Sequence, residues 1–544
     1  MGLLSFLTGN DADRRAYERA RFRWRSTREG KARSTPVERP SVARHFPDRT
    51  GIPIGLTADG EVVRLPSAVE TRHGIIAGSS GSGKSSFALG VVLQLIDAAC
   101  GWTTTVFPAF PDPGTSLELI DPKGELATLV MALTAAIYDA APEAVQERLT
   151  GLFRLFDLTV DGVTPMPLFG TATDALPPAY RADLRVQVED EGADHRATEL
   201  SRYVRAQYYK VLAHLGYPLN YAFSLRFFTD PLFRARVLER VPERDLRLYW
   251  GNFDQLVPRA TAAAVLRFLH RRIGDKVIRL GIGLPKEDEA RLLGSRPPAR
   301  ITLGNFAART LPAARAMEQA RLRTTDACAE AVIRDAATPG QLVVDEVGML
   351  FHRSMALQDV FALASRTLRS AGLGLTLIGQ DFETAVPGDL VTTLKLNAVW
   401  TALFRSDATE GSWVYPFVET DDPALVGATD AERKRNFLRH VQVLPTRRFY
   451  LHVKGLPAVP LTALPVPYPD PATPERLMEL RERFLATIGK RSIVSVADAE
   501  AAIEAWEARV VAGSEIAPAE PRGRVVSMDD AFRDLDEEGS DGPR

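Results

Sequence analysis

Short runs of apolar residues recur along the chain, and each of them ends in polar residues. These runs occupy 73–78, 116–121, 300–306, 341–346, 375–380 and 397–405. Continuous apolar runs of this length are typical of parallel strands that are buried on both faces. Helical patterns alternate with them at 84–98, 312–335 and 356–370. The alternation predicts a doubly wound α/β fold with a predominantly parallel sheet.

The stretch from 126 to 297 breaks this alternation, because its apolar residues recur almost entirely at helical spacing. We therefore expect a large, mostly helical domain inserted within the α/β domain. Near the C-terminus, 447–455 is predicted to be a strand, and a Pro-rich segment and two helices at 474–488 and 496–511 follow it. The predicted organisation begins with a basic arm at 1–50 and the first part of a motor domain at 51–125. The helical insertion at 126–297 and the second part of the motor domain at 298–470 follow. C-terminal helices at 471–515 and an acidic disordered tail at 516–544 end the chain.

Composition narrows the class of protein. The chain has 544 residues, a formal net charge of -2 and two cysteines, Cys100 and Cys328. Its length predicts more than one domain, and its two distant cysteines exclude a disulfide framework. No apolar run is long enough to span a bilayer, so we expect a cytoplasmic protein with at most a peripheral contact at the inner face of the membrane. The eight histidines show neither metal-ligand nor catalytic-triad spacing.

A phosphate-binding loop follows the first of the apolar runs. The segment GSSGSGKS matches the pattern G-x-x-x-x-G-K-[ST], with an apolar strand before it and an apolar helix after it. Glycines let the backbone wrap around phosphates, while the N-terminus of the helix offers N–H donors. A Gly/Ser linker that contains Gly-Lys by chance is the alternative. We predict that ATP is bound by Gly78, Ser79, Ser80, Gly81, Ser82, Gly83, Lys84, Ser85 and Ser86, with Lys84 on the β- and γ-phosphates and Ser85 on Mg²⁺.

Two other strand ends carry candidate catalytic residues. Asp345 and Glu346 end the run QLVVDE, and we expect Asp345 to hold Mg²⁺ through water and Glu346 to act as general base. A solvated turn or a helix cap is the alternative for such an acidic pair. Gln380 ends another run, where its amide could contact the γ-phosphate or the attacking water, or could merely close the strand.

The order of these motifs resembles a known family. SLELIDPKGE at 116–125 is similar to the DPKGE segment of conjugation coupling ATPases, the TraG/TraD-type proteins of type IV secretion, within the FtsK–HerA class of RecA-like motors. The P-loop, DPKGE, the helical insertion, the acidic strand end and RSAGLGLTLIGQ at 369–380 follow one another in the family's order. FRSDA at 404–408 and the segment 227–253 also resemble elements of related members.

The resemblance implies a RecA-like ATPase that assembles as a homo-oligomer, usually a hexamer, and moves DNA toward a secretion channel. It further implies that Asp121 and Lys123 lie near the nucleotide and that Arg369 acts on a neighbour's ATP. Relaxases or channel proteins would be its partners. This chain departs from the family because it lacks the usual N-terminal transmembrane helices. A HerA-like ATPase of DNA processing or defence, and an ATP-switched adaptor for protein cargo, therefore remain alternatives.

The two ends of the chain suggest further contacts. Arginines and aromatic residues interleave over 14–33, a composition that suits DNA, an anionic membrane surface or a solvated arm. The C-terminal tail is rich in acids, which either keep the chain soluble or recruit cargo.

Overall fold

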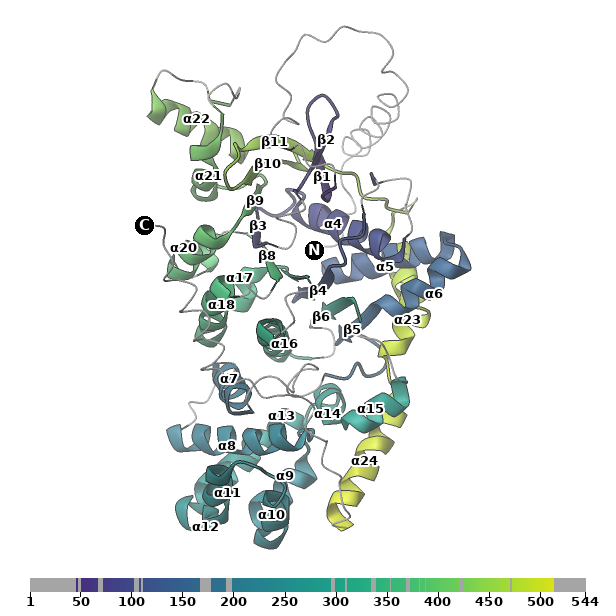
Figure 1. Ribbon diagram of the computed structural model, residues 1–544, viewed down its shortest axis with the longest axis vertical. Helices are drawn as coiled ribbons and strands as arrows, with labels where there is room; N and C mark the ends of the chain where they lie inside the picture. The colour runs from purple at the N-terminus through teal and green to yellow at the C-terminus, as the bar shows by residue number, and fades with distance from the viewer. Residues whose placement is uncertain are drawn as a thin grey trace, which may run out of the picture. The chain divides into compact units, whose positions relative to one another are not determined.

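The computed structural model divides the chain into two compact units (Figure 1). Unit 1 comprises 1–157, 296–307 and 334–491, and unit 2 comprises 158–295, 308–333 and 492–544. The structure describes residue 46 and residues 50–512, with gaps at 67–71, 102–106, 109–110, 167–177, 192–197, 295–298, 309–310, 334–338, 353, 368–371, 381, 387, 420–421, 423, 426, 428 and 470–471.

A single sheet of eleven strands forms the centre of unit 1. Its strands lie in the order β2-β1-β11-β10-β9-β3-β8-β7-β4-β6-β5. From β9 to β5 all neighbours are parallel, while β10, β11, β1 and β2 extend the sheet in antiparallel pairs. The strand bounds are β1 Pro53–Leu56, β2 Val62–Arg64, β3 Gly74–Ala77, β4 Ser116–Asp121, β5 Phe153–Asp157, β6 Ile301–Asn305, β7 Gly340–Val344, β8 Leu373–Gly379, β9 Trp400–Leu403, β10 Arg448–Val453 and β11 Val459–Ala463.

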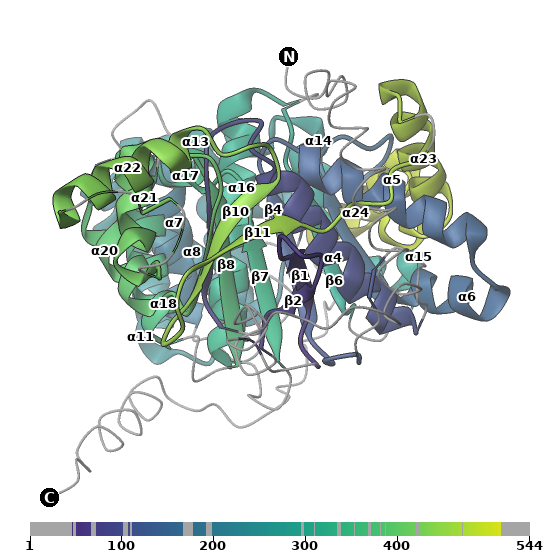
Figure 2. The same cartoon turned by 90° about the horizontal axis from the view of Figure 1, so that it is seen from above.

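Helices cover both faces of this sheet, as the buried strands require (Figure 2). One side carries α4 (Lys84–Cys100), α5 (Glu125–Ala140), α6 (Glu143–Leu152) and α23 (Pro474–Ala486). The other side carries α17 (Val347–Phe351), α18 (Met355–Thr367) and α20 (Gly388–Asn397). Unit 1 also contains the α-helices α19 Phe382–Ala385, α21 Ala408–Val414 and α22 Asp430–Gln442.

The strand order defines the fold class. β8 lies between β3, which precedes the P-loop, and β7, which ends in the acidic pair. This separation by one strand is the arrangement of RecA-like P-loop proteins. The predicted α/β class with a predominantly parallel sheet is therefore confirmed, and the apolar runs at 73–78, 116–121, 300–306, 341–346 and 375–380 correspond to β3, β4, β6, β7 and β8.

Unit 2 is built from helices. An aromatic cluster fills its interior, in which the ring of Trp250 lies 4.7 Å from the rings of both Phe227 and Phe253. Aromatic side chains bury large apolar areas, so this cluster is a major source of stability for the unit. The bounds are α7 Pro178–Glu191, α8 Glu199–Leu215, α9 Tyr221–Thr229, α10 Pro231–Leu238, α11 Arg244–Gly251, α12 Phe253–Leu256, α13 Arg259–Ile273, α14 Lys276–Gly283, α15 Lys286–Leu293, α16 Ala313–Ile333 and α24 Val496–Ala512.

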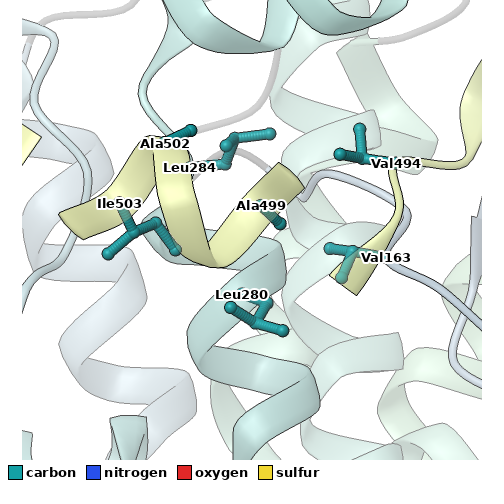
Figure 3. Close-up of a cluster of buried hydrophobic side chains, with 7 residues drawn as sticks. All are labelled: Val163, Leu280, Leu284, Val494, Ala499, Ala502 and Ile503. Carbon is teal, nitrogen blue, oxygen red and sulfur yellow. The ribbon is translucent and has the colours of Figure 1, made fainter. Parts of the chain in front are cut away.

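A second hydrophobic cluster joins distant parts of the chain within unit 2 (Figure 3). Helix α24 contributes Ala499, Ala502 and Ile503, which pack against Leu280 and Leu284. Beside them, residues 163 and 494 form an isolated antiparallel bridge. Segments more than 200 positions apart are thus parts of one core.

The compact units divide the chain differently from the predicted domains. The sequence pattern places 126–157 in the helical insertion, but β5 pairs with β6 in the sheet of unit 1, with Phe153 opposite Ile301. Conversely, the sequence pattern places α16 in the motor domain and α24 among separate C-terminal helices, yet both belong to unit 2. The predicted arm at 1–50 and the tail at 516–544 lie almost entirely outside the described residues. Within the described part of the chain, none of the helices combines the length and the apolar character needed to cross a membrane.

Candidate active site

The P-loop connects β3 to α4 and depends on glycine at its tightest points. Gly81 and Gly83 have positive φ angles of 69° and 108°, which side chains with a Cβ rarely adopt. A Cβ on Gly83 would also come within 2.9 Å of the backbone nitrogen of Arg447. The loop is therefore folded by its glycines, and α4 starts at Lys84 directly after it.

The side chain of Lys84, at the start of α4, contacts the P-loop that precedes it. This side chain is buried, and its Nζ donates a hydrogen bond of 2.9 Å to the carbonyl oxygen of Ser79. The Ser82 hydroxyl is also buried and has no hydrogen-bond partner among the described residues. An ammonium at the centre of a glycine-rich loop, at the N-terminus of a helix, suits the phosphates of a nucleotide.

Asp345 follows β7 and is buried, and its Oδ1 accepts a hydrogen bond of 2.9 Å from the backbone N–H of Glu346. Burial raises the pKa of this carboxyl well above its ordinary value, and the nearby charges of Asp121 and Glu346 raise it further. A buried carboxyl with acidic neighbours is a suitable ligand for a cation. Together with the hydroxyl of Ser85 at the start of α4, it fits the predicted role in holding Mg²⁺.

We expect Asp345→Asn to stabilise the protein when no Mg²⁺ is present. Because the folded pKa is raised, the stability linked to this carboxyl is complete below its ordinary pKa and is lost as pH rises through the raised value. The amide removes the buried charge and can still accept the hydrogen bond from Glu346. Thermal denaturation in EDTA should show that the free energy of unfolding of Asp345→Asn exceeds that of the wild type by on the order of 1 kcal/mol at pH 8, and by less at pH 5. An equal gain in the free energy of unfolding at both pH values would contradict the raised pKa of Asp345.

The DPKGE segment forms a turn that is held by its own aspartate. Asp121 accepts hydrogen bonds from the backbone N–H groups of Lys123, Gly124 and Ala127 at 3.0, 2.8 and 2.9 Å. Burial raises the pKa of Asp121 to about 6, although these hydrogen bonds act in the opposite direction. Oδ1 is thus used within the turn and Oδ2 by the first turn of α5, so Asp121 serves the turn, while Lys123 is the residue that the turn presents.

Three strand ends meet around one carboxylate. The Nζ of Lys123, after β4, lies 2.6 Å from Oε1 of Glu346, after β7. The Nε2 of Gln380, after β8, lies 3.0 Å from the same oxygen and 3.4 Å from Oε2. Because β4, β7 and β8 are adjacent and parallel, their carboxyl ends bring these residues together. Of the predicted site residues, this edge of the sheet also holds Lys84 and Asp345, which follow β3 and β7.

Two arginines contact the P-loop without having been predicted as site residues. The carbonyl oxygen of Arg405 accepts a 2.6 Å hydrogen bond from Ser79 N–H, and its guanidinium lies 3.5 Å from the hydroxyl of Ser79 and the carbonyl oxygen of Ser80. The backbone N–H of Arg447 donates to the Ser82 carbonyl oxygen at 2.8 Å. The strand-end position of Arg405, in the FRSDA segment, was an available signal. The sequence contains no such signal for Arg447, because the backbone of this residue makes the contact.

Other candidates fall outside the described residues. These are Arg369, the predicted trans arginine, together with the arginine-rich segment 14–33 and the acidic tail. Gly372, which lies in the segment 369–380 together with Arg369, is described and has a φ of 70° just before β8.

No protein-family model matches the chain, and no curated protein matches its sequence. Several solved structures are similar to it. VirB4 of Thermoanaerobacter pseudethanolicus is 14% identical with a TM-score of 0.46, over 77% of this chain and 98% of that one. The plasmid coupling protein TrwB in complex with ADP and Mg²⁺ is 14% identical with a TM-score of 0.43, over 80% and 95%. The cytoplasmic domain of the Thermomonospora curvata type VII secretion ATPase EccC is 14% identical with a TM-score of 0.29, over 82% and 32%.

These structures include a conjugative coupling protein, the class of protein that the P-loop and DPKGE motifs resemble. At 14% identity and with TM-scores below 0.5, the function of this chain has to be inferred from its own residues.

Proposed function

We propose that this protein is a Mg²⁺-dependent ATPase that moves DNA, acting as a coupling protein which delivers DNA or nucleoprotein to a type IV secretion channel. The observation that carries the ATPase part is the meeting of Lys84, Asp345 and Glu346 at the carboxyl edge of one parallel sheet. A P-loop and an acidic strand end, separated by one strand, provide the parts that ATP hydrolysis requires.

Each residue of the site has a distinct task in this proposal. The N–H groups of the P-loop and the ammonium of Lys84 bind the β- and γ-phosphates of ATP, while Ser85 and Asp345 hold Mg²⁺. Mg²⁺, when bound, offsets negative charge on the phosphate oxygens. Glu346 accepts a proton from the attacking water. Gln380, which donates to Glu346, directly follows β8, the strand between those of the phosphate loop and the base, and can respond to the loss of the γ-phosphate.

The DNA part of the proposal rests on the resemblance of GSSGSGKS and DPKGE to conjugation coupling ATPases. That family implies a homo-oligomer, usually a hexamer, in which Arg369 would reach a neighbour's nucleotide. The arginine-rich segment 14–33 supplies basic charge within a chain whose formal net charge is -2, and it could attract phosphates. Relaxases or channel proteins would be the further partners.

The test is ATP hydrolysis by the purified full chain, with and without single- and double-stranded DNA. We expect DNA to stimulate turnover at low salt, and salt to weaken the stimulation because phosphate contacts are screened. Lys84→Ala should abolish both basal and stimulated turnover. If neither DNA changes the rate of hydrolysis, the ATPase part of the proposal holds and the DNA-moving part is contradicted. An adaptor for protein cargo would then be favoured. Absence of hydrolysis under every condition would overturn the whole proposal.

A further inference from the structure

The carboxylate of Glu346 is held asymmetrically. Its Oε1 accepts hydrogen bonds from both Lys123 at 2.6 Å and Gln380 at 3.0 Å, whereas Oε2, among the described residues, has only a 3.4 Å contact with Gln380. Two donors on one oxygen fix the plane of the carboxylate and leave most of the accepting capacity of Oε2 available. A general base needs one accessible oxygen in a defined place.

The backbone of Glu346 does not by itself fix the side chain. Its φ and ψ angles are 47° and 46°, a left-handed conformation that is uncommon for residues other than glycine. Residues in such conformations persist when their surroundings hold them, and they cluster at active sites. The side-chain contacts with Lys123 and Gln380 are part of what holds this residue.

The turn that carries Lys123 is held in place by buried contacts. The Asp121 hydrogen bonds fix the turn, and Gly124, with a φ of 75°, packs so closely that an added Cβ would lie 2.2 Å from Oδ1 of Asn305. Asn305 in turn donates to Asp157 at 3.1 Å, and Arg481 pairs with the same carboxylate at 3.1 Å. These residues are buried, so the turn rests on a fully packed polar support. Support of this kind gives a site residue a defined position.

Lys123 also keeps its charge in this place. Partial burial alone would lower the pKa of its ammonium, but the hydrogen bond and charge of Glu346, followed by the charges of Glu125 and Asp345, outweigh burial and raise it. The cation is therefore present throughout the physiological pH range.

We infer that Lys123 is a positioning residue for the proposed general base: its ammonium pins Oε1 of Glu346, so that Oε2 receives the proton of the attacking water. This inference rests on the proposed ATPase function. It differs from the expectation drawn from the family resemblance, under which Lys123 would lie at the nucleotide. A phosphate ligand would contribute to ATP binding, whereas a positioning residue contributes to the chemical step.

The test is Lys123→Met in the full chain, with kcat, KM and the Kd of a fluorescent ATP analogue measured in parallel. Misplacement of a catalytic group by about 1 Å can lower a rate by about 100-fold, so we expect kcat to fall by about 10- to 100-fold. KM and the Kd should change by less than about 3-fold. Lys123→Arg, which restores a cation, should recover most of kcat.

Lys395→Met provides a matched control. Lys395 forms another lysine–glutamate pair in unit 1, with Glu383, and its side chain is 33% exposed, compared with 37% for Lys123. Loss of that pair should leave kcat and KM at wild-type values. A fall in kcat equal to that of Lys123→Met would show a general effect of removing an ion pair and would overturn the inference.

Three further outcomes for Lys123→Met would also overturn it. A large rise in the Kd would make Lys123 a phosphate ligand, a faster basal rate would make it a restraint on the base, and an unchanged rate would leave it without a role. Glu346→Gln separates these failures from failure of the proposed function. If Glu346→Gln is inactive and Lys123→Met is not, only the positioning role is wrong; if Glu346→Gln hydrolyses ATP normally, the proposed base is wrong as well.

Discussion

Glu346→Gln is expected to bind ATP with nearly wild-type affinity and to lose hydrolysis. Positioned general bases contribute about 10²- to 10⁴-fold to a rate, so kcat should fall by at least about 100-fold. The amide is nearly isosteric with the carboxylate, and its oxygen can still accept the hydrogen bond from Lys123. Nucleotide binding should therefore survive, because Glu346 has no predicted contact with the phosphates.

The measurements for this variant are equilibrium binding of a fluorescent ATP analogue and steady-state phosphate release. A fall in kcat without a change in the Kd assigns Glu346 to the chemical step. Wild-type turnover by Glu346→Gln would remove the general base from the site. Loss of binding would instead place Glu346 in the nucleotide pocket.

Lys84→Ala is expected to lose nucleotide binding, and hydrolysis with it. A hydrogen bond to a charged group contributes about 1.5–3 kcal/mol, and Lys84 is predicted to make more than one with the phosphates. The Kd for ATP should therefore rise by at least about 100-fold. The substitution also removes the hydrogen bond from Nζ to the Ser79 carbonyl oxygen, which helps to close the loop.

Lys454→Ala is a suitable control for this variant, because Lys454 is exposed after β10 and has no predicted part in the site. Its binding and turnover should equal those of the wild type. Thermal denaturation of Lys84→Ala shows whether the fold survives. Normal ATP binding by a folded Lys84→Ala protein would contradict the phosphate role of this residue.

Much of the parallel sheet could be predicted because its strands are continuous apolar runs. LTLIG in β8 and LVV in β7 are buried throughout, and runs this short between loops are typical of strands that are buried on both faces. β5 was missed because FRLFD is only five residues long and directly follows a helix in a region of helical spacing. β11 was missed because Pro460 lies within it, and proline usually argues against an inner strand.

The site was predictable only where a motif is local. The P-loop and the acidic pair are contiguous in sequence, and their strand and helix context could be recognised from the neighbouring residues. The contact between Lys123 and Glu346 joins positions 223 residues apart, and it depends on β4 lying next to β7. Strand order is a tertiary property, so single-sequence patterns do not contain it. The same holds for Arg447, which meets the P-loop through its backbone.

The hydrophobic cluster of unit 2 has a consequence for the synthesis of the protein on the ribosome. Domains generally fold as units while the chain emerges, beginning with N-terminal ones. Here Leu280 and Leu284 cannot reach their final packing until Ala499, Ala502 and Ile503 have been translated, more than 200 residues later. These apolar side chains of the nascent chain must therefore wait, exposed or temporarily covered, until α24 has left the exit tunnel. Co-translational folding of unit 2 can thus be completed only after Ile503 has been translated.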